Sequence, residues 1–573
     1  MPIGYWVKKQ ILDTFSNKTI SGKYEVRAGL STSDSKRFLR LWHEVNINRC
    51  NFDALNEDCA ILSKAKWFPI NKGGSCRKWY GNRDYLLNYY NNGEELKYWL
   101  THNPNDPTTT SWSRYIRSPK FYFKKSLTWS KVASGDFSLR YCPPGSIFSD
   151  ASNGIFIEDD NEWKYLLGLM NSKLTNVYLK IVSPTLNTTS GDIGKIPFIY
   201  KLNCNIQDII TSNISISRSD WDAHETSWDF QRNELLSIDT STYMENIDYK
   251  MEKHFEETGE HISLALDAPQ LGSLEWRMEQ YKTKWERKFM QLHKNEEELN
   301  RQFIDIYGLQ GELTPDVPLN EITILQQGEI NVVENSITWN EDVMTKQLIS
   351  YAVGCMLGRY RLDKPGLHIA HPNLTDEEIA PYEYNGEQWE IDDDGIMPLM
   401  PNDCGFSDNA SARFADFIRV ALGNEEHVAN LNYVEKCLGK TLEQYFVKDF
   451  WKDHKKMYQN RPIYWLFSSK KGAFQVIAYM HRMNAYTAER VRSKYLLPYI
   501  EHLEAEIDKL DARRAELSTK ESKQLQALQK QLDECREYHE RLQVVAEQTI
   551  SFDLDDGVVV NYAKFGDILQ KIK

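Results

Sequence analysis

Two apolar stripes near the C-terminal end constrain the fold of this chain most strongly. The first stripe repeats at nearly heptad spacing and consists of Leu496, Leu503, Ile507, Leu510 and Leu517. The second consists of Leu525, Leu528, Leu532, Cys535, His539 and Leu542. Between them, Ser518-Thr519-Lys520-Glu521 has the pattern of a capping box, which begins a new helix. The pattern predicts an antiparallel coiled-coil hairpin, which either packs on itself or grips a partner.

The rest of the chain changes character near Lys201. Before it, short strand-like runs at 120–129 and 154–157 alternate with turns, a helix is expected over 162–181, and a loop follows over 183–197. After it, helical patterns dominate, at 276–310, 347–362 and 414–422, with a loop expected over 363–410. We therefore predict an α+β fold, in which a mixed α/β domain precedes a mainly α-helical region that carries the hairpin.

A chain of 573 residues is too long for one ordinary core, so several domains are expected. The predicted segments are a mixed α/β domain over 1–200, a helical connector over 201–345, a helical C-terminal domain over 346–495, the hairpin over 496–548, and a tail over 549–573 that packs back on that domain.

The charge is distributed unevenly between these segments. The whole chain has a net charge of −13, but residues 1–200 hold 27 Lys and Arg against 18 Asp and Glu. Only this first part resembles a polyanion-binding surface, although an uneven polar surface is the alternative. The nine cysteines form no Cys-x-x-Cys pair, so neither zinc nor a disulfide framework is indicated, and reduced thiols suit the cytoplasm. A run of about 18 apolar residues is absent, so no membrane span is expected.

The segment 64–81, KAKWFPINKGGSCRKWYG, is the strongest candidate site. Five cations, Lys64, Lys66, Lys72, Arg77 and Lys78, alternate with aromatic residues around a Gly-Gly turn. Lys and Arg contact phosphates, Arg also reads guanine, and glycine lets a backbone approach closely. A hairpin with an aromatic inner face and a basic outer face explains the same pattern equally well.

Motifs for catalysis are missing from the sequence. Adenine methylation needs an Asn/Asp-Pro-Pro-aromatic loop for the flipped base, but the only Pro-Pro lies in Cys142-Pro143-Pro144-Gly145, which reads as a loop kink. Lys72-Gly73-Gly74-Ser75 lacks the spacing of a cofactor-binding turn. The run Asp392-Asp393-Asp394 is expected to be a solvated acidic loop rather than a metal site. No catalytic residue and no metal ligand is therefore predicted.

Beyond these patterns, the string from Trp67 to Asn82 resembles the signature of the PglX family, the adenine-specific DNA methyltransferases of BREX phage-defence systems. Matching segments follow in the same order at 28–45, 166–199, 217–230, 296–315, 348–363, 460–469 and 554–569. The resemblance covers nearly the whole chain and corresponds to the C-terminal half of the family. The family commonly has Thr-Gly-Asp-Asn in its opening loop, where this chain has Thr32-Ser33-Asp34-Ser35.

The resemblance implies a function in DNA target recognition for residues 1–200. Implied partners are double-stranded DNA, an N-terminal methyltransferase half in the same or a separate chain, other BREX proteins and phage DNA-mimic inhibitors. No cofactor is expected in this chain, whereas S-adenosyl-L-methionine is expected for the complete enzyme. The alternative is a protein-interaction scaffold without direct DNA contact. The implied DNA-binding residues are Ser31, Thr32, Asp34, Arg37, Lys64, Lys66, Trp67, Asn71, Lys72, Gly73, Gly74, Arg77, Lys78, Trp79, Tyr80, Thr185 and Asn187.

Overall fold

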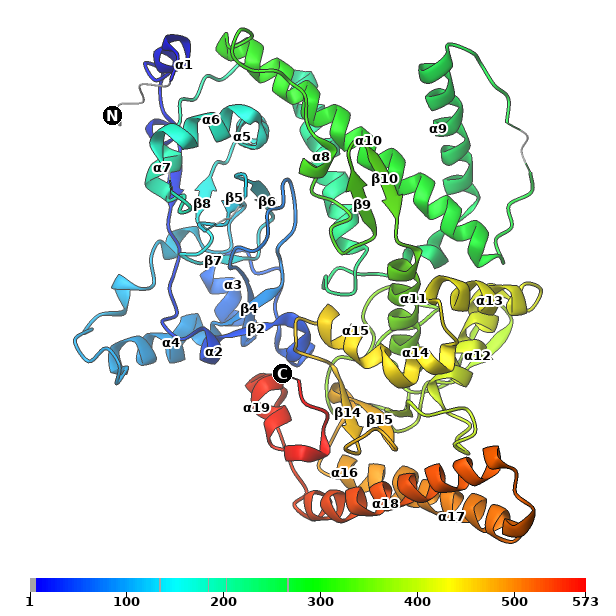
Figure 1. Ribbon diagram of the computed structural model, residues 1–573. Helices are drawn as coiled ribbons and strands as arrows, with labels where there is room; N and C mark the ends of the chain where they lie inside the picture. Colours follow the sequence, from blue (N-terminus) through cyan, green and yellow to red (C-terminus); the bar gives the residue numbers. More distant parts are fainter. Residues whose placement is uncertain (1–6, 133–134, 184, 202, 265–266, 573) are drawn as a thin grey trace. The chain divides into compact units, whose positions relative to one another are not determined.

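The computed structural model describes residues 7–132, 135–183, 185–201, 203–264 and 267–572. Helices and short strands both occur throughout, which confirms the predicted α+β class (Figure 1). The chain forms two compact units. Unit 1 comprises the described parts of Met1–Trp42, Asn48–Ser227 and Lys282–Asn340, and unit 2 those of His43–Ile47, Trp228–Tyr281 and Glu341–Lys573. The five predicted segment boundaries remain a prediction.

Unit 1 contains two four-stranded sheets. One has the strand order β2-β4-β3-β7 and the other the order β1-β8-β5-β6. The strands are β1 (Glu25–Arg27), β2 (Leu39–Leu41), β3 (Trp67–Asn71), β4 (Tyr85–Asn88), β5 (Ser126–Trp129), β6 (Leu139–Cys142), β7 (Ile147–Phe148) and β8 (Gly154–Phe156). β3 pairs antiparallel with β4 and parallel with β7. Every residue of β3 and of β5 is buried, so these strands lack the polar–apolar alternation of a half-exposed strand.

The helices of unit 1 are α1 (Lys9–Thr14), α2 (Ser35–Phe38), α3 (Glu57–Leu62), α4 (Tyr90–His102), α5 (Asp160–Asn171), α6 (Lys173–Val182), α7 (Ser190–Gly194) and α8 (Cys204–Asp222). The long helix α10 (Leu274–Tyr307) enters unit 1 at Lys282, and a hairpin of β9 (Ile330–Val333) and β10 (Ser336–Trp339) follows it. Asn295 of α10 donates to Asn213 of α8 at 2.7 Å, so these two helices lie in contact.

The helix expected over 162–181 is in fact two helices, α5 and α6, that meet at Ser172. The break has a local cause. The Asn171 side chain accepts a hydrogen bond from the Leu139 backbone N–H at 2.8 Å and donates one to the Leu139 carbonyl at 2.9 Å. Ser172 has extended backbone angles, and its hydroxyl donates to the Leu169 carbonyl at 2.6 Å. The side chain of Asn171 thus bonds to β6 at the end of α5, where the helix stops.

Unit 2 combines a three-stranded sheet with helices. Its sheet has the order β13-β15-β14, and β11 pairs with β12 as a separate hairpin. The strands are β11 (Tyr382–Tyr384), β12 (Glu387–Trp389), β13 (Ile396–Pro398), β14 (Tyr464–Ser468) and β15 (Gln475–Tyr479). The helices are α9 (Thr240–Thr258), α11 (Glu341–Met356), α12 (Ala410–Leu422), α13 (His427–Leu438), α14 (Leu442–Lys448), α15 (Phe450–Met457), α16 (Thr487–Arg490), α17 (Leu497–Asp511), α18 (Thr519–Glu547) and α19 (Val558–Ala563).

The prediction of a loop over 363–410 was wrong in part, because this range contains the strands β11, β12 and β13. Asn385 and Gly386 join β11 to β12 with φ angles of 51° and 76°. An Asn-Gly pair with both φ angles positive is the preferred two-residue turn of a hairpin. The Asn385-Gly386 pair in the sequence could therefore have predicted a hairpin with a strand on either side.

The two striped segments near the C-terminal end form α17 and α18, which lie side by side (Figure 1). The predicted capping box is present, since Ser518 Oγ accepts from the Glu521 backbone N–H and the Glu521 carboxylate accepts from the Ser518 N–H. Arg536 of α18 pairs with Glu504 of α17 at 2.7 Å. The coiled-coil character of this pair remains a prediction.

Candidate nucleic-acid interface

The predicted DNA-binding residues differ widely in exposure. The exposed ones are Arg37, Lys64, Gly74, Thr185 and Asn187. The partly buried ones are Ser31, Asp34, Lys66, Lys72 and Gly73. The buried ones are Thr32, Trp67, Asn71, Arg77, Lys78, Trp79 and Tyr80. Within the basic-aromatic segment, the loop 72–76 is accessible, whereas β3 before it and the residues from Arg77 onward are buried.

Arg77 and Lys78 form internal ion pairs. Arg77 Nη2 lies 2.7 Å from Asp220 of α8, and its Nε donates to the Tyr80 carbonyl at 2.8 Å. Lys78 Nζ lies 2.6 Å from Glu296 of α10. Burial disfavours the charged ammonium, but the Glu296 carboxylate outweighs it and raises the pKa of Lys78. Both cations are therefore charged inside unit 1, where their carboxylates neutralise them.

The residues after Lys78 extend this internal attachment. Trp79 Nε1 donates to the same Glu296 carboxylate at 2.8 Å. Trp79 and Asn82 have φ angles of 69° and 55°, and Gly81 has a φ of 128°. A Cβ at Gly81 would lie 2.4 Å from Arg77 Nε, so only glycine fits this turn. The string from Arg77 to Asn82 is thus a tight, buried turn fixed to α8 and α10.

The loop 72–76, by contrast, packs against other loops. Ser130 Oγ donates to the Gly74 carbonyl at 3.0 Å, and Asn82 Nδ2 donates to the Ser75 carbonyl at 2.9 Å. Lys72 Nζ lies 4.4 Å from the centroid of the Tyr85 ring, and burial lowers the pKa of this lysine. Both glycines have positive φ angles, so the loop takes a conformation that other residues rarely adopt.

The loop near Thr185 and Asn187, which the same resemblance implied, reaches the same place. Asn187 forms an antiparallel bridge with Val132, and the Thr188 N–H donates to the Lys131 carbonyl at 2.8 Å. Trp129 Nε1 at the end of β5 donates to the Thr188 carbonyl at 2.9 Å. Residues 72–76, 130–132, 135–138 and 185–188 therefore form one group, which we call the loop cluster.

The loop cluster surrounds a pocket of about 490 Å³. Gly74 and Thr185, both predicted from the sequence, are among the residues that line it. Its hydroxyl groups belong to Ser75, Ser130, Ser138, Ser183, Thr185 and Thr188. Lys180, near the end of α6, contributes a positive charge to the lining, and Asp136 contributes a negative one. Sequence reasoning did not single out Asp136 or Lys180, because nothing in the local pattern indicates that α6 borders the Gly-Gly loop.

The opening loop, 31–37, has a structural explanation for two of its four predicted residues. Asp34 is the N-cap of α2 and accepts from the Arg37 backbone N–H at 3.1 Å. The Arg37 guanidinium pairs with Glu95 at 3.0 Å and lies 4.6 Å from the Trp99 ring centroid. This loop therefore packs on α4 through Arg37.

The Pro-Pro motif lies in the turn between β6 and β7, as its interpretation as a loop kink predicted. Gly145 closes that turn with a φ of 103°, and a Cβ there would lie 2.2 Å from the Phe52 carbonyl oxygen. The motif thus has a geometric role in unit 1.

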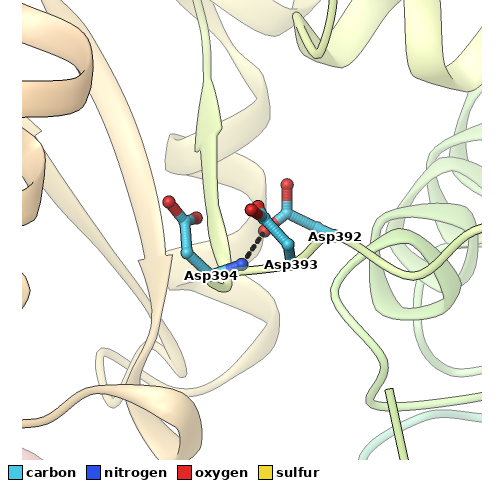
Figure 2. Close-up of side chains that lie close together, drawn as sticks. All are labelled: Asp392, Asp393 and Asp394. Atoms are coloured by element: carbon cyan, nitrogen blue, oxygen red, sulfur yellow. Dashed lines mark hydrogen bonds between the residues drawn. The ribbon is translucent and has the colours of Figure 1, made fainter. Parts of the chain in front are cut away.

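The acidic run of unit 2 also has a structural explanation (Figure 2). The ligand atoms of Asp392, Asp393 and Asp394 lie within 4.8 Å of one another. However, Lys494 Nζ lies 2.9 Å from Asp393 and 2.8 Å from Asp394. Asp392 accepts from the backbone N–H groups of Asp394 and Gly395, and burial raises its pKa to about 7. An ammonium group thus already pairs with two of the three carboxylates.

Comparison with known proteins gives two similar sequences. The adenine-specific methyltransferase BrxX of Escherichia coli O9:H4 (strain HS) is 35% identical over an alignment that covers 100% of this chain and 45% of that protein. The adenine-specific methyltransferase PglX of Lacticaseibacillus casei (strain Zhang) is 33% identical over 98% of this chain and 44% of that protein. The chain thus spans somewhat less than half the length of these curated relatives. No protein-family model matches it. Among the described residues, none of the helices combines the length and apolar character needed to cross a bilayer.

Proposed function

We propose that this chain is the DNA-target-recognising half of a BREX-type adenine-N6 DNA methyltransferase, and that unit 1 contacts double-stranded DNA through the loop cluster. The similarity to two proteins named as adenine-specific methyltransferases supports the enzyme class. The loop cluster supports the DNA-binding part of the proposal, because two segments that are far apart in the sequence, both implied by the resemblance, meet there around one pocket.

The structure changes which residues we propose for DNA contact. Lys72, Lys131 and Lys180 supply positive charge on or beside the loop cluster and suit phosphate contacts. Arg77, Lys78 and Trp79 instead act as positioning residues, because their polar groups bond to α8 and α10. Their internal bonds hold the turn that follows Cys76, and thereby fix the Gly73–Gly74 loop above the pocket.

Methyl transfer belongs to a part of the enzyme that this sequence does not contain. The chain has neither a Gly-rich turn with the spacing for S-adenosyl-L-methionine nor a polar-Pro-Pro-aromatic loop for adenine. We therefore assign cofactor binding and catalysis to an N-terminal half, in the same or a separate chain. Other BREX proteins and phage DNA mimics are proposed partners of the assembled enzyme.

The test is the salt dependence of duplex DNA binding, measured by fluorescence anisotropy. Each phosphate contact contributes about −0.9 to the slope of log K against log salt concentration. We expect the triple variant Lys72→Ala, Lys131→Ala, Lys180→Ala to bind more weakly and to lose roughly 2 to 3 from that slope.

The matched control is the triple variant Lys520→Ala, Lys523→Ala, Lys530→Ala, which removes three exposed lysines from α18. It should bind DNA like the wild type. Unchanged binding by the loop-cluster variant would contradict the proposed interface. A wild-type chain that retains no DNA at ~50 mM salt would favour the protein-interaction scaffold instead.

A further inference from the structure

The pocket of the loop cluster has walls of two chemical kinds. Phe137 and Leu179 contribute apolar surface from within, and Leu186 stands 69% exposed at its border. The same lining includes the charged residues Lys180 and Asp136 and the hydroxyl-bearing residues named above. At about 490 Å³ the pocket lies within the range of about 300–1,000 Å³ that small-molecule and cofactor sites occupy.

This composition favours one class of ligand. A simple anion would be repelled by Asp136, and a purely apolar ligand would desolvate the charged groups of Lys180 and Asp136 without pairing them. A nucleotide has groups that match both the apolar and the polar residues of the lining. Its base has two apolar faces, the edge of the base carries hydrogen-bond donors and acceptors, and its phosphate pairs with an ammonium group. A carboxylate accepts well from the exocyclic amine of a base such as cytosine.

The hydrogen bonds within the pocket hold its walls in place. Asn176 of α6 accepts from the Phe137 N–H at 3.1 Å through its carbonyl oxygen, so its amide N–H groups are not used in that bond. Ser138 Oγ accepts from the Arg77 N–H at 3.2 Å, which connects this wall to the buried turn. The ion pair of Arg77 thus fixes one side of the pocket before any ligand enters.

We propose that this pocket receives a single nucleotide extruded from the bound DNA. Its base would stack against Phe137, Leu179 and Leu186, its edge would meet Asp136, and its phosphate would meet Lys180. Enzymes that extrude a nucleotide bind its base by stacking and by hydrogen bonds to its edge. The inference rests on the proposed function, since it requires that unit 1 meets DNA.

The experiment compares two duplexes of the same sequence, one fully paired and one with a single unpaired cytidine. The full chain should bind the bulged duplex at least about fivefold more tightly, which is the low end of the contribution of one stacked base. Two variants test the pocket. Gly135→Trp adds a bulky ring at a residue that lines the pocket and has free space around its Cβ position, and Leu186→Ser removes exposed apolar surface. Both should bind the two duplexes with equal affinity. The readout is the ratio of these two affinities, because substitutions in the loop cluster also affect binding of the paired duplex.

Gly311→Trp is the matched control, since Gly311 is exposed and a Cβ there also meets nothing within 4 Å. It should keep the preference for the bulge. Equal binding of both duplexes by the wild type, or a preference that survives in Gly135→Trp, overturns the pocket inference but leaves the proposed function intact. No binding of either duplex overturns both.

A second arm identifies the source of the nucleotide. Free dCMP and dTMP are added to the same proteins, and binding is followed by ligand-observed NMR. Weak binding of dCMP that Gly135→Trp abolishes, together with a bulge preference, supports the extruded nucleotide. Tight binding of a free nucleotide without any bulge preference overturns it in favour of a small-molecule site.

Discussion

Two clusters of charged residues gave similar signals in the sequence but lie in different surroundings. In unit 1, the side chains of Lys78 and Glu296 are 9% and 3% exposed. In unit 2, Lys494 and Asp393 are 43% and 79% exposed. Both clusters pair opposite charges at less than 3 Å. A run of like charges in a sequence therefore predicts neither the exposure nor the function of its residues, because the oppositely charged partners lie elsewhere in the chain.

The energetic consequence of this difference is large. Removing one member of a buried ion pair leaves an uncompensated charge and costs about 3–5 kcal/mol, whereas an exposed pair contributes about 0–1 kcal/mol. The two clusters should therefore respond very differently to the loss of one lysine, even though each lysine has a carboxylate at hydrogen-bonding distance.

The largest effect is expected for Lys78→Met. It leaves the Glu296 carboxylate buried without its counter-charge, although Trp79 Nε1 still donates to it, so the free energy of unfolding should fall by about 3–5 kcal/mol. Urea unfolding followed by tryptophan fluorescence measures it. The double variant Lys78→Met, Glu296→Gln should regain much of the loss, because Gln keeps an acceptor for Trp79 without a charge. A loss below about 1 kcal/mol in the single variant would contradict the buried-pair argument.

A second buried pair of unit 1 should make stability depend on pH. His224 Nε2 lies 2.6 Å from Glu329, and its Nδ1 lies 2.7 Å from the Asp220 carbonyl. Burial and the nearby Arg77 lower the pKa of His224, but the carboxylates of Glu329 and Asp220 outweigh them and raise it to about 9. The folded pKa thus exceeds the unfolded value of about 6.5. The stabilisation is complete below pH 6.5 and is lost as the pH rises through about 9.

The variant His224→Gln tests this dependence. Between pH 7 and 9.5 the wild type should lose a few kcal/mol of unfolding free energy, at up to about 1.4 kcal/mol per pH unit, and the variant should lose clearly less. Burial raises the pKa of Asp84 to about 7. Its titration therefore changes the stability mainly below this pH range, and it does so equally in both proteins. Parallel pH profiles for the two proteins would rule out His224 as the titrating group.

A smaller effect is expected in unit 2. Lys494→Met removes the ammonium from Asp393, whose side chain is 79% exposed, and from Asp394, whose side chain is 8% exposed. Because Asp394 still accepts from the Tyr495 hydroxyl and the Ile396 N–H, the loss should stay below that of Lys78→Met, at about 1–2 kcal/mol. The same urea titration measures it, with Lys523→Met on α18 as the control for removing an exposed lysine. A loss equal to that of Lys78→Met would show that exposure does not separate the two clusters.

The sequence predicted the element types better than the directions in which side chains point. The capping box at Ser518, the long helix over 276–310 and the α+β class followed from local patterns, because spacing and caps act within a few residues. The partners of Arg77 and Lys78 could not be predicted, since Asp220 and Glu296 lie 143 and 218 residues away along the chain. The Gly-Gly loop was recognised correctly as a special turn, but its pocket depends on α6, which only the folded structure brings there.

The smallest effect is expected for added metal ions. A divalent cation at Asp392–Asp394 would have to displace Lys494 from two carboxylates, and Asp392 Oδ1 already accepts from the backbone N–H groups of Asp394, Gly395 and Ile396. The oxygen ligands that Mg²⁺ needs are thus engaged within the fold. Neither millimolar Mg²⁺ nor a chelator should shift the thermal midpoint of the wild type. A saturable rise with Mg²⁺ that Asp393→Asn abolishes would show instead that the acidic loop exchanges its lysine for a metal, and the two clusters would then differ in function as well as in exposure.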